Sequence, residues 1–355
     1  MRFVFLIPDL SSSAVRHRIN SWLFECPPRA RDLLARALGD PRMSTASVSG
    51  GTLNLMRHCW AARRAGADAV MATPSGKDTY GSDWSAHELP FIRWSDRRPD
   101  DVCIIPDFVT DAINEVEGPA VAYLQIPTHL HTNFDYLDPR VTMWTDSPFM
   151  LERCRARFPD KQIDIVPNVV DNELFPFVAQ EERTEGQLFA FPRKGADFIE
   201  ATRRAYEEQG GTYWQLELVD GLSIHELAKR MQKPAAFLAS ADVEGCALPP
   251  QESMATGMIV VGKTARGANF VMEHRKTAMV AETPEAAAES LREIEDPKLR
   301  SRIAKNAHQA ISRYFPENEP ADFWRRNVAH FGAQLERDAG TAGAAPARRR
   351  VRVAR

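Results

Sequence analysis

The sequence has no apolar run long enough to cross a membrane. Its first run, Phe3–Ile7, ends at Pro8 and Asp9. This run is also too short for an export signal, so we expect a cytoplasmic protein. The five cysteines stand far apart without a C-x-x-C pair, and their odd number excludes a fully paired disulfide framework. Reduced thiols agree with the expected location.

The sequence also has no excess of positive charge. Its 45 lysines and arginines are balanced by 48 acidic residues, which leaves a net charge of −3. A general nucleic-acid-binding surface is therefore not predicted. The exception is residues 339–355, which contain five arginines and no acid. We expect a disordered basic tail there, either solvated or in peripheral contact with acidic headgroups at the inner membrane face or with RNA.

Two further motifs are missing. No G-x-G-x-x-G follows the first apolar run, where the sequence reads Leu6-Ile-Pro-Asp-Leu-Ser. This absence argues against a nicotinamide-dependent dehydrogenase. Histidine, cysteine and acidic residues show no ligand spacing, so no metal site is predicted.

Short, continuously apolar runs alternate with stretches of helical periodicity. This pattern is typical of parallel strands that helices bury on both faces. The predicted strands are 3–7, 69–72, 102–105, 121–126, 141–144, 163–166, 188–191, 214–219, 235–239, 258–261 and 279–281. We therefore predict an α/β fold with two doubly wound, Rossmann-like units, as a length of 355 residues also suggests.

The boundary between the two units is predicted in Pro167–Asp171 and the polar stretch Gln180–Gln187 that follows. Residues 1–170 would form the first unit and residues 171–316 the second. A final helix at about residues 317–336 is expected to pack back on the first unit. A ligand would lie in a central cleft, at the carboxyl ends of the strands.

The most informative segment is Phe237–Gly257, which reads F-L-A-S-A-D-V-E-G-C-A-L-P-P-Q-E-S-M-A-T-G. A helix is predicted to start at Pro249-Pro250, because proline is tolerated in a first turn, and to end at the last glycine. The free N–H groups at such a start attract phosphate. Glu244 in the loop and Glu252 in the first turn flank this opening and can accept hydrogen bonds from sugar hydroxyls. The residues alone leave open whether the acids bind a ligand or are a solvated loop acid and a helix-dipole partner.

This segment resembles the E-G-x-x-L-P-x-x-E-x-M-A-x-G signature of the retaining GT-B glycosyltransferases, known as glycosyltransferase family 4 or glycosyl transferases group 1. The matching residues are Glu244-Gly245, Leu248-Pro249, Glu252, Met254-Ala255 and Gly257. Four other segments resemble landmarks of the family. They are the linker pattern at Pro167–Asp171, the Arg/Lys pair at Arg193 with Lys194-Gly195, the glycine loop after the signature at Arg266–Asn269, and the N-terminal glycine loop at Gly50-Gly51. The resemblance is strongest over residues 160–315 and implies the GT-B arrangement, in which the two units face a central cleft.

By this resemblance, Glu252 would bind the ribose of a nucleotide and Glu244 the hydroxyls of the donor sugar. Arg193 and Lys194 would neutralise the diphosphate, so the reaction would need neither a metal nor a cofactor besides the nucleotide-sugar substrate. The implied donor-binding residues are Glu252, Gly245, Leu248, Pro249, Gly50 and Gly51. The implied catalytic residues are Glu244, Arg193, Lys194 and His129.

His129 is implied because the family often places a histidine facing the donor sugar after the strand predicted at Val121–Ile126. His131 is a weaker candidate, and a purely structural role is the alternative for both. Arg193 and Lys194 are adjacent, whereas the family often separates the two cations, so one of them can miss the phosphate. Residues 11–49 would either cover the acceptor site or pack on the edge of the first unit.

The function implied is the transfer of a hexosyl or deoxyhexosyl group, with retention, from a nucleotide-diphosphate sugar. The acceptor would be a hydroxyl of a sugar, a lipid or a small molecule, in the synthesis of a polysaccharide, a glycolipid or a glycosylated metabolite. Two alternatives remain open: a degenerate transferase that binds a nucleotide sugar without turnover, and a nucleotide-sugar epimerase on the same fold. The oligomeric state is not predicted.

Overall fold

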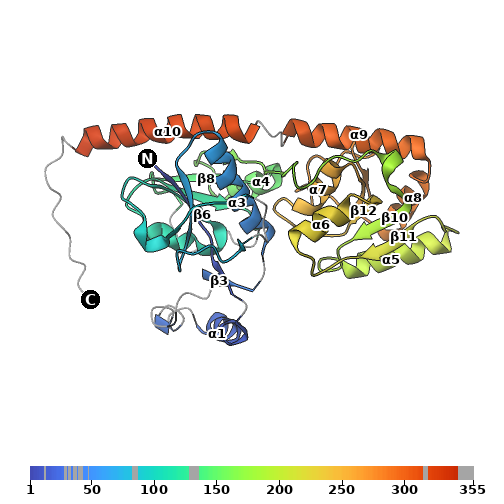
Figure 1. Ribbon diagram of the computed structural model, residues 1–355, viewed down its shortest axis with the longest axis horizontal. Helices are drawn as coiled ribbons and strands as arrows, with labels where there is room; N and C mark the ends of the chain where they lie inside the picture. Colours follow the sequence, from blue (N-terminus) through green and yellow to red (C-terminus); the bar gives the residue numbers. More distant parts are fainter. Residues whose placement is uncertain are drawn as a thin grey trace.

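The protein consists of two α/β units, each with a parallel sheet, that lie side by side along the long axis of the molecule (Figure 1). The computed structural model describes residues 1–11, 13–27, 30, 33–34, 38, 43–46, 48–81, 87–127, 136–314 and 319–342. The predicted α/β class with doubly wound parallel sheets is confirmed. Within these residues, no helix combines the length and apolar content needed to cross a membrane.

The first unit contains a seven-stranded parallel sheet in the order β5-β4-β1-β6-β7-β8-β9. Its strands are β1 (Phe3–Leu6), β4 (Ala69–Thr73), β5 (Phe91–Arg93), β6 (Val102–Pro106), β7 (Ala120–Leu124), β8 (Val141–Thr145) and β9 (Ile163–Ile165). The chain winds outward on both sides of β1 and β6, so these two strands form the switch point of the sheet. Apolar side chains are buried on both faces, which explains the continuously apolar runs.

Helices and short elements surround this sheet. They are α1 (Ala14–Glu25), α3 (Gly50–Arg64), α4 (Pro148–Arg157), the 3-10 helices η3 (Trp94–Asp96) and η4 (Asp107–Glu115), and a small parallel pair of β2 (Asp9–Leu10) and β3 (Ser44–Thr45). Helix α3 packs against the sheet, whereas α1 projects from the base of the unit (Figure 1). The pair β2 and β3 and the strand β5 were not predicted, because they are short and only half-buried.

The second unit contains a five-stranded parallel sheet in the order β11-β10-β12-β13-β14. Its strands are β10 (Thr184–Ala190), β11 (Gln215–Leu218), β12 (Pro234–Ala239), β13 (Ile259–Gly262) and β14 (Met279–Val280). Its helices are η6 (Gln180–Glu182), α5 (Ala196–Glu208), α6 (Ile224–Met231), α7 (Leu248–Thr256), α8 (Pro284–Glu293) and α9 (Pro297–Tyr314). The switch point of this sheet lies between β10 and β12.

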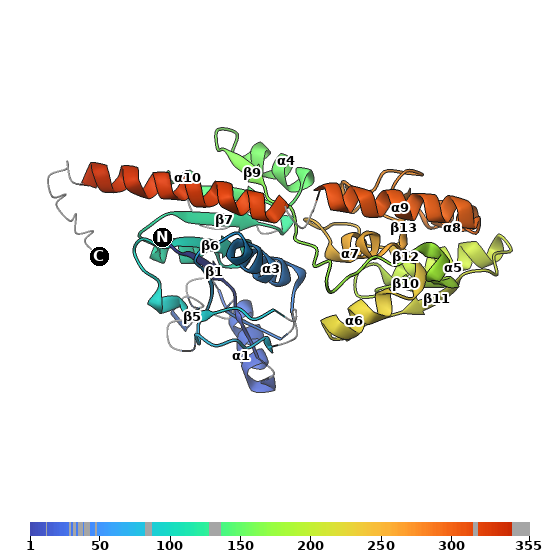
Figure 2. The ribbon, with the colours of Figure 1, turned by 45° about the horizontal axis from the view of Figure 1, so that its top comes forward.

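The last helix, α10 (Glu319–Ala342), returns to the first unit and lies along it in both ribbon views (Figures 1 and 2). The buried ring of Trp324 lies 5.2 Å from that of Phe3 and 5.8 Å from that of Trp144. The helix is longer than the predicted 317–336, so residues 339–342 are helical where the basic tail was expected to begin. Residues 343–355 lie outside the described part of the chain.

Strand β7 ends at Leu124, two residues before the predicted end. The reason is a buried carboxylate: Asp107 Oδ2 accepts the backbone N–H groups of Gln125, at 2.8 Å, and Ile126. These two N–H groups therefore bind a side chain instead of extending the ladder. The early end places Gln125 at the carboxyl edge of the sheet.

Candidate functional site

Helix α7 and the loop before it carry the two acids of the signature. The helix spans Leu248–Thr256, one residue longer at its start than predicted, so Glu252 lies beyond the first turn and its predicted placement there is wrong. Pro249 and Pro250 have no N–H group. Of the four N–H positions that a helix start leaves free, only Ala247 and Leu248 can therefore donate backbone hydrogen bonds to an anion.

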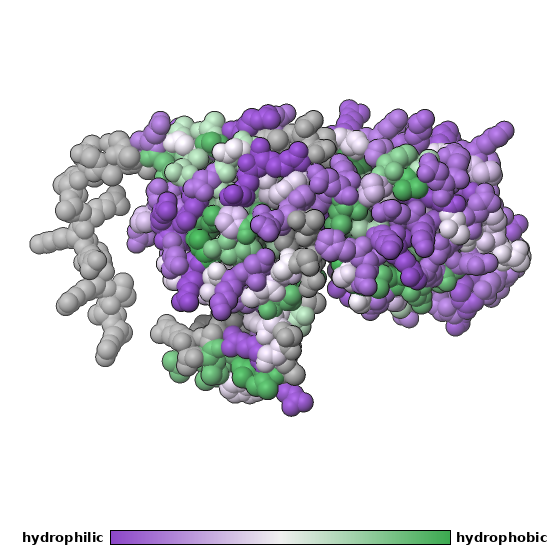
Figure 3. All heavy atoms as spheres, in the orientation of Figure 1, coloured by the Kyte–Doolittle hydropathy of each residue, from purple (hydrophilic) through white to green (hydrophobic). Residues whose placement is uncertain are grey.

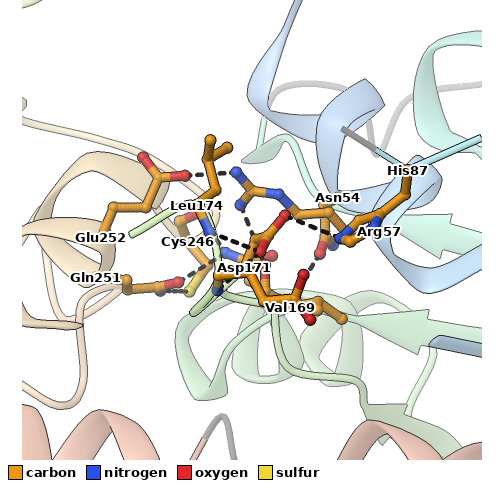
Figure 4. Close-up of polar contacts among 11 residues, drawn as sticks. Asn54, Arg57, His87, Val169, Asp171, Leu174, Cys246, Gln251 and Glu252 are labelled. Carbon is orange, nitrogen blue, oxygen red and sulfur yellow. Dashed lines mark hydrogen bonds and ion pairs between the residues drawn. The ribbon is translucent and has the colours of Figure 1, made fainter. Parts of the chain in front are cut away.

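Glu252 is buried between the two units, and its carboxylate faces α3. The side chain is 4% exposed, and Oε1 accepts a hydrogen bond from Arg57 Nη2 at 2.8 Å. Arg57 Nη1 also donates to the carbonyl of Val169, in the chain segment that joins the units, at 3.1 Å. Figure 4 shows the guanidinium between this carbonyl and the carboxylate. The first unit therefore holds the residue to which the resemblance assigns ribose binding.

Lys194 and Glu244 form an ion pair at the switch point of the second sheet, beyond the carboxyl ends of β10 and β12. The lysine side chain is 53% exposed, so the pair is weak and can exchange partners. The lysine backbone is fixed, because its carbonyl accepts a hydrogen bond from Ser240 Oγ at 2.6 Å. Gly195 follows with a φ of 91°, and a Cβ there would lie 2.3 Å from the Ser240 carbonyl oxygen. Arg193 remains exposed.

Gly50 and Gly51 form the first turn of α3, and this turn faces the start of α7. An ideal Cβ on Gly50 would lie 3.4 Å from Leu248 Cδ1, and one on Gly51 would lie 3.2 Å from Gln125 Oε1. The N-termini of two helices from different units therefore meet at one place. Their positive ends and free N–H groups make this place suitable for an anion with several oxygens, such as a diphosphate.

Gly245, in the loop before α7, lies directly against the first unit. Its ideal Cβ would be only 1.7 Å from the carbonyl oxygen of Gln125. The carbonyl of Gly245 accepts a hydrogen bond from Ser147 Oγ at 2.6 Å, and Asn168 Nδ2 donates to the carbonyl of Cys246 at 3.0 Å. A glycine is required here because two backbones from different units approach each other.

Gln125 is the residue that β7 brings to this contact, and it was not predicted from the sequence. It follows the last residue of β7 directly, is buried, and its side-chain oxygen faces Gly51. The available signal was its place as the first polar residue after a buried strand. His129 and His131, predicted for this region, lie outside the described residues.

Two buried acids, Asp107 and Asp146, were also missed. An ideal Cβ on Gly245 would lie 2.9 Å from Asp146 Oδ2, so this acid borders the signature loop. Asp146 Oδ1 has no hydrogen-bond partner within the described part of the chain. Burial, reinforced by the charge of Asp107, raises the pKa of Asp146 well above its usual range. The protonated form of this carboxyl is therefore favoured next to the loop.

Two doubly wound units that meet at the starts of α3 and α7 form a GT-B fold, as predicted. Solved structures with this fold include sucrose-phosphate synthase from Thermosynechococcus elongatus (13% identity, TM-score 0.61, covering 94% of this chain and 100% of the other). Anabaena HepE in complex with UDP and glucose is also similar (12% identity, TM-score 0.50, covering 93% and 100%). The pneumococcal O-GlcNAc transferase GtfA, in complex with UDP and GlcNAc, is similar at 14% identity and a TM-score of 0.52. That match covers 66% of this chain and 57% of GtfA, so the chain spans just over half the length of that protein.

Residues 212–310 match the family model described as glycosyl transferases group 1. The predicted resemblance to this family is therefore confirmed. The matched segment contains Glu244, Glu252 and the whole of α7. Among the curated proteins, none matches the chain.

Proposed function

We propose that this protein is a retaining glycosyltransferase that uses a nucleotide-diphosphate sugar as donor and a hydroxyl group as acceptor. The observation that carries the proposal is the meeting of the α3 and α7 N-termini beside Lys194, Glu244 and Glu252. The family match over residues 212–310 supports it. The transferred group would be a hexosyl or deoxyhexosyl, and the product a polysaccharide, a glycolipid or a glycosylated metabolite.

In this proposal the donor lies along the start of α7. The diphosphate would bind between the two helix N-termini, with Lys194 as its cation and Arg193 able to join it from the surface. Leu248 and Glu252 are four residues apart on one helix, which corresponds to about 6 Å. The ribose next to the diphosphate would therefore reach Glu252, while Glu244 in the preceding loop would bind the sugar hydroxyls.

The proposed reaction replaces one bond at the anomeric carbon with another. The bond from that carbon to the diphosphate oxygen breaks, and its electron pair leaves with the diphosphate. The acceptor oxygen bonds to the same face of the carbon, and its proton passes to the departing phosphate oxygen. Fixed N–H groups and Lys194 stabilise the charge that develops on the leaving group, so the proposed reaction is independent of metal ions. His129 would face the donor sugar.

A degenerate transferase that binds a nucleotide sugar without turnover is the second candidate function. The observation that favours it is that both signature acids are already paired with cations, Glu244 with Lys194 and Glu252 with Arg57. In an active enzyme the exposed pair of Lys194 and Glu244 has to separate, so that both side chains can bind the donor. In a degenerate one both pairs would persist in the presence of a nucleotide sugar.

The test is nucleotide release from UDP-, GDP- and dTDP-sugars, with and without sugar, lipid and small-molecule acceptors, in the presence of EDTA. We expect one donor to release its nucleotide faster when its acceptor is added. Binding of a nucleotide sugar by calorimetry without any release would favour the degenerate transferase. Neither release nor binding across the panel would contradict both candidates.

We also propose that the protein acts in the cytoplasm and contacts the inner membrane face through α1 and the basic tail. On α1, Val15 is 68% and Trp22 is 50% exposed. These residues lie about two helical turns apart on one face, with the exposed Arg18 between them. Figure 3 shows hydrophobic residues gathered on this projecting part of the molecule. Co-flotation with anionic vesicles should weaken in Trp22→Ser, and equal flotation of this variant and the unchanged protein would contradict the role of α1.

A further inference from the structure

Arg57 is a buried cation in the middle of α3 that the signature of the second unit does not include. Its side chain is 1% exposed. It lies six residues after Gly51, about 9 Å further along the helix. Helix α3 therefore meets α7 at two places: at its glycine start, which faces Leu248, and at Arg57, which faces Glu252.

The position of the guanidinium is fixed from the side of the first unit. Asn54, one turn earlier on α3, accepts the backbone N–H of Val169 at 3.0 Å, while Arg57 donates to the carbonyl of the same residue. The guanidinium also lies over the ring of Phe175, 5.7 Å from its centroid. Both backbone groups of Val169 are thus held by α3, and this arrangement sets where the remaining N–H groups of Arg57 point.

The contact with Glu252 has a geometric consequence for the carboxylate. A buried ion pair contributes little net stability, because the loss of hydration offsets much of the attraction. The planar fork of an arginine nevertheless fixes direction better than a lysine ammonium does. Arg57 donates a hydrogen bond to Oε1 of Glu252. A carboxylate accepts hydrogen bonds through both oxygens, so Oε2 is the oxygen through which a ribose hydroxyl would bind.

We infer that Arg57 is a positioning residue of the donor site: it holds Glu252 Oε1 and so directs Oε2 toward the ribose of the donor nucleotide. This inference rests on the proposed function. It assigns to the first unit a part in recognising a ribonucleoside diphosphate. Arg57 acts on the ribose only through Glu252 and does not touch the reacting atoms.

The experiment measures how strongly the protein distinguishes ribose from a sugar without hydroxyls. Binding of UDP and GDP and of their 2′,3′-dideoxy analogues is measured by calorimetry for the full chain and for Arg57→Met, Arg57→Lys and Arg63→Met. Arg63 is the matched control, because it lies on the same helix, is exposed and donates to the carbonyl of Ala69 within the first unit.

We expect the unchanged protein and Arg63→Met to bind the ribonucleotide about tenfold or more tightly than its dideoxy analogue. In Arg57→Met this ratio should fall toward one, while the diphosphate still binds. Arg57→Lys should give an intermediate ratio. A residue with only a structural role would lower the melting temperature and leave the ratio unchanged.

Two other outcomes separate this inference from the proposed function. If the unchanged protein shows no preference for ribose, the assignment of Glu252 in the proposed function fails, and the inference fails with it. If the preference is present and persists in full in Arg57→Met, the inference is overturned and the proposed function stands. Should Arg57→Met not fold, a full preference in Arg57→Lys overturns the inference in the same way.

Discussion

The second unit contributes an exposed ion pair to the site besides the buried Glu252, whereas the first unit contributes buried side chains from separate places in the chain. Lys194 and Glu244 lie in two loops at one switch point, and their ion pair is open to solvent. The first unit supplies Arg57 from α3, Gln125 from the end of β7 and Ser147 from the start of α4. Exposed groups exchange partners easily, but buried groups act by fixing geometry.

This difference suggests a division of roles. The second unit would bind the donor with side chains that can leave their present partners. The first unit would set the distance between the units and the direction of Glu252. Changes at the contact between the units should therefore disturb function more than changes of a single exposed charge.

The largest effect is expected for Gly245→Ala. The new methyl group would lie 1.7 Å from the Gln125 carbonyl oxygen, so the loop and β7 have to separate. A displacement of this kind near reacting groups lowers turnover by about 100-fold. Steady-state donor turnover measures it, with Gly332→Ala as the control, because no atom outside the surrounding helix backbone lies within 4 Å of a Cβ there. Equal turnover in both variants would show that the close contact is not needed for function.

The next effect concerns Glu252, where the two units share one carboxylate. Glu252→Gln keeps the size of the side chain but removes the charge that faces Arg57. We expect nucleotide affinity and turnover to fall by about tenfold to 100-fold, because a ribose hydroxyl loses a strong acceptor. Calorimetry with a nucleoside diphosphate provides the measurement. Unchanged affinity would remove Glu252 from the donor site.

A smaller effect is expected from the exposed cations of the second unit. Lys194→Ala should lower the turnover number by about tenfold, since a charge that stabilises the leaving group is lost from a solvent-exposed position. Arg193→Ala should have a weaker effect, because Arg193 is exposed whereas Lys194 already reaches Glu244. Turnover of the two variants is compared side by side. If neither changes, the diphosphate does not bind at this loop.

The smallest effect on turnover is expected from a pH dependence of stability in the first unit. The ring of His58 is buried and makes two hydrogen bonds. Its Nε2 donates to the carbonyl of Pro167 at 3.0 Å, and its Nδ1 accepts from Trp324 Nε1. Burial lowers the pKa of His58 to about 4, below the value of about 6.5 in an unfolded chain. The unfolded state therefore binds the proton first as the pH falls, so stability is lost between pH 6.5 and about 4, by up to about 3 kcal/mol.

Denaturant unfolding at pH 7.5 and pH 5 measures this loss. His58→Gln should be less stable than the unchanged protein at pH 7.5 but should lose less free energy of unfolding on acidification. A loss of equal size in both proteins would show that other groups cause the acid sensitivity. The pH-dependent part of the free energy of unfolding would then not come from the contact of His58 with Pro167 and α10.

The fold was predictable because the buried strands are short apolar runs that alternate with helical stretches. These runs form two series along the chain, one for each sheet. The ends of elements were less predictable. The end of β7 depends on Asp107, which lies on another element and captures the N–H groups of Gln125 and Ile126. The start of α7 before Pro249 brought Glu252 out of the first turn.

The sequence by itself determined the α/β class and the resemblance to glycosyl transferases group 1, because apolar runs and the signature are local patterns. The resemblance also predicted one site for Glu244, Glu252, Lys194 and the glycine pair. Only the tertiary structure decided that Arg57 pairs with Glu252 and that Gln125 lies against Gly245. These partners are distant in the chain, and no local pattern records a contact that arises when two separately wound sheets are packed together.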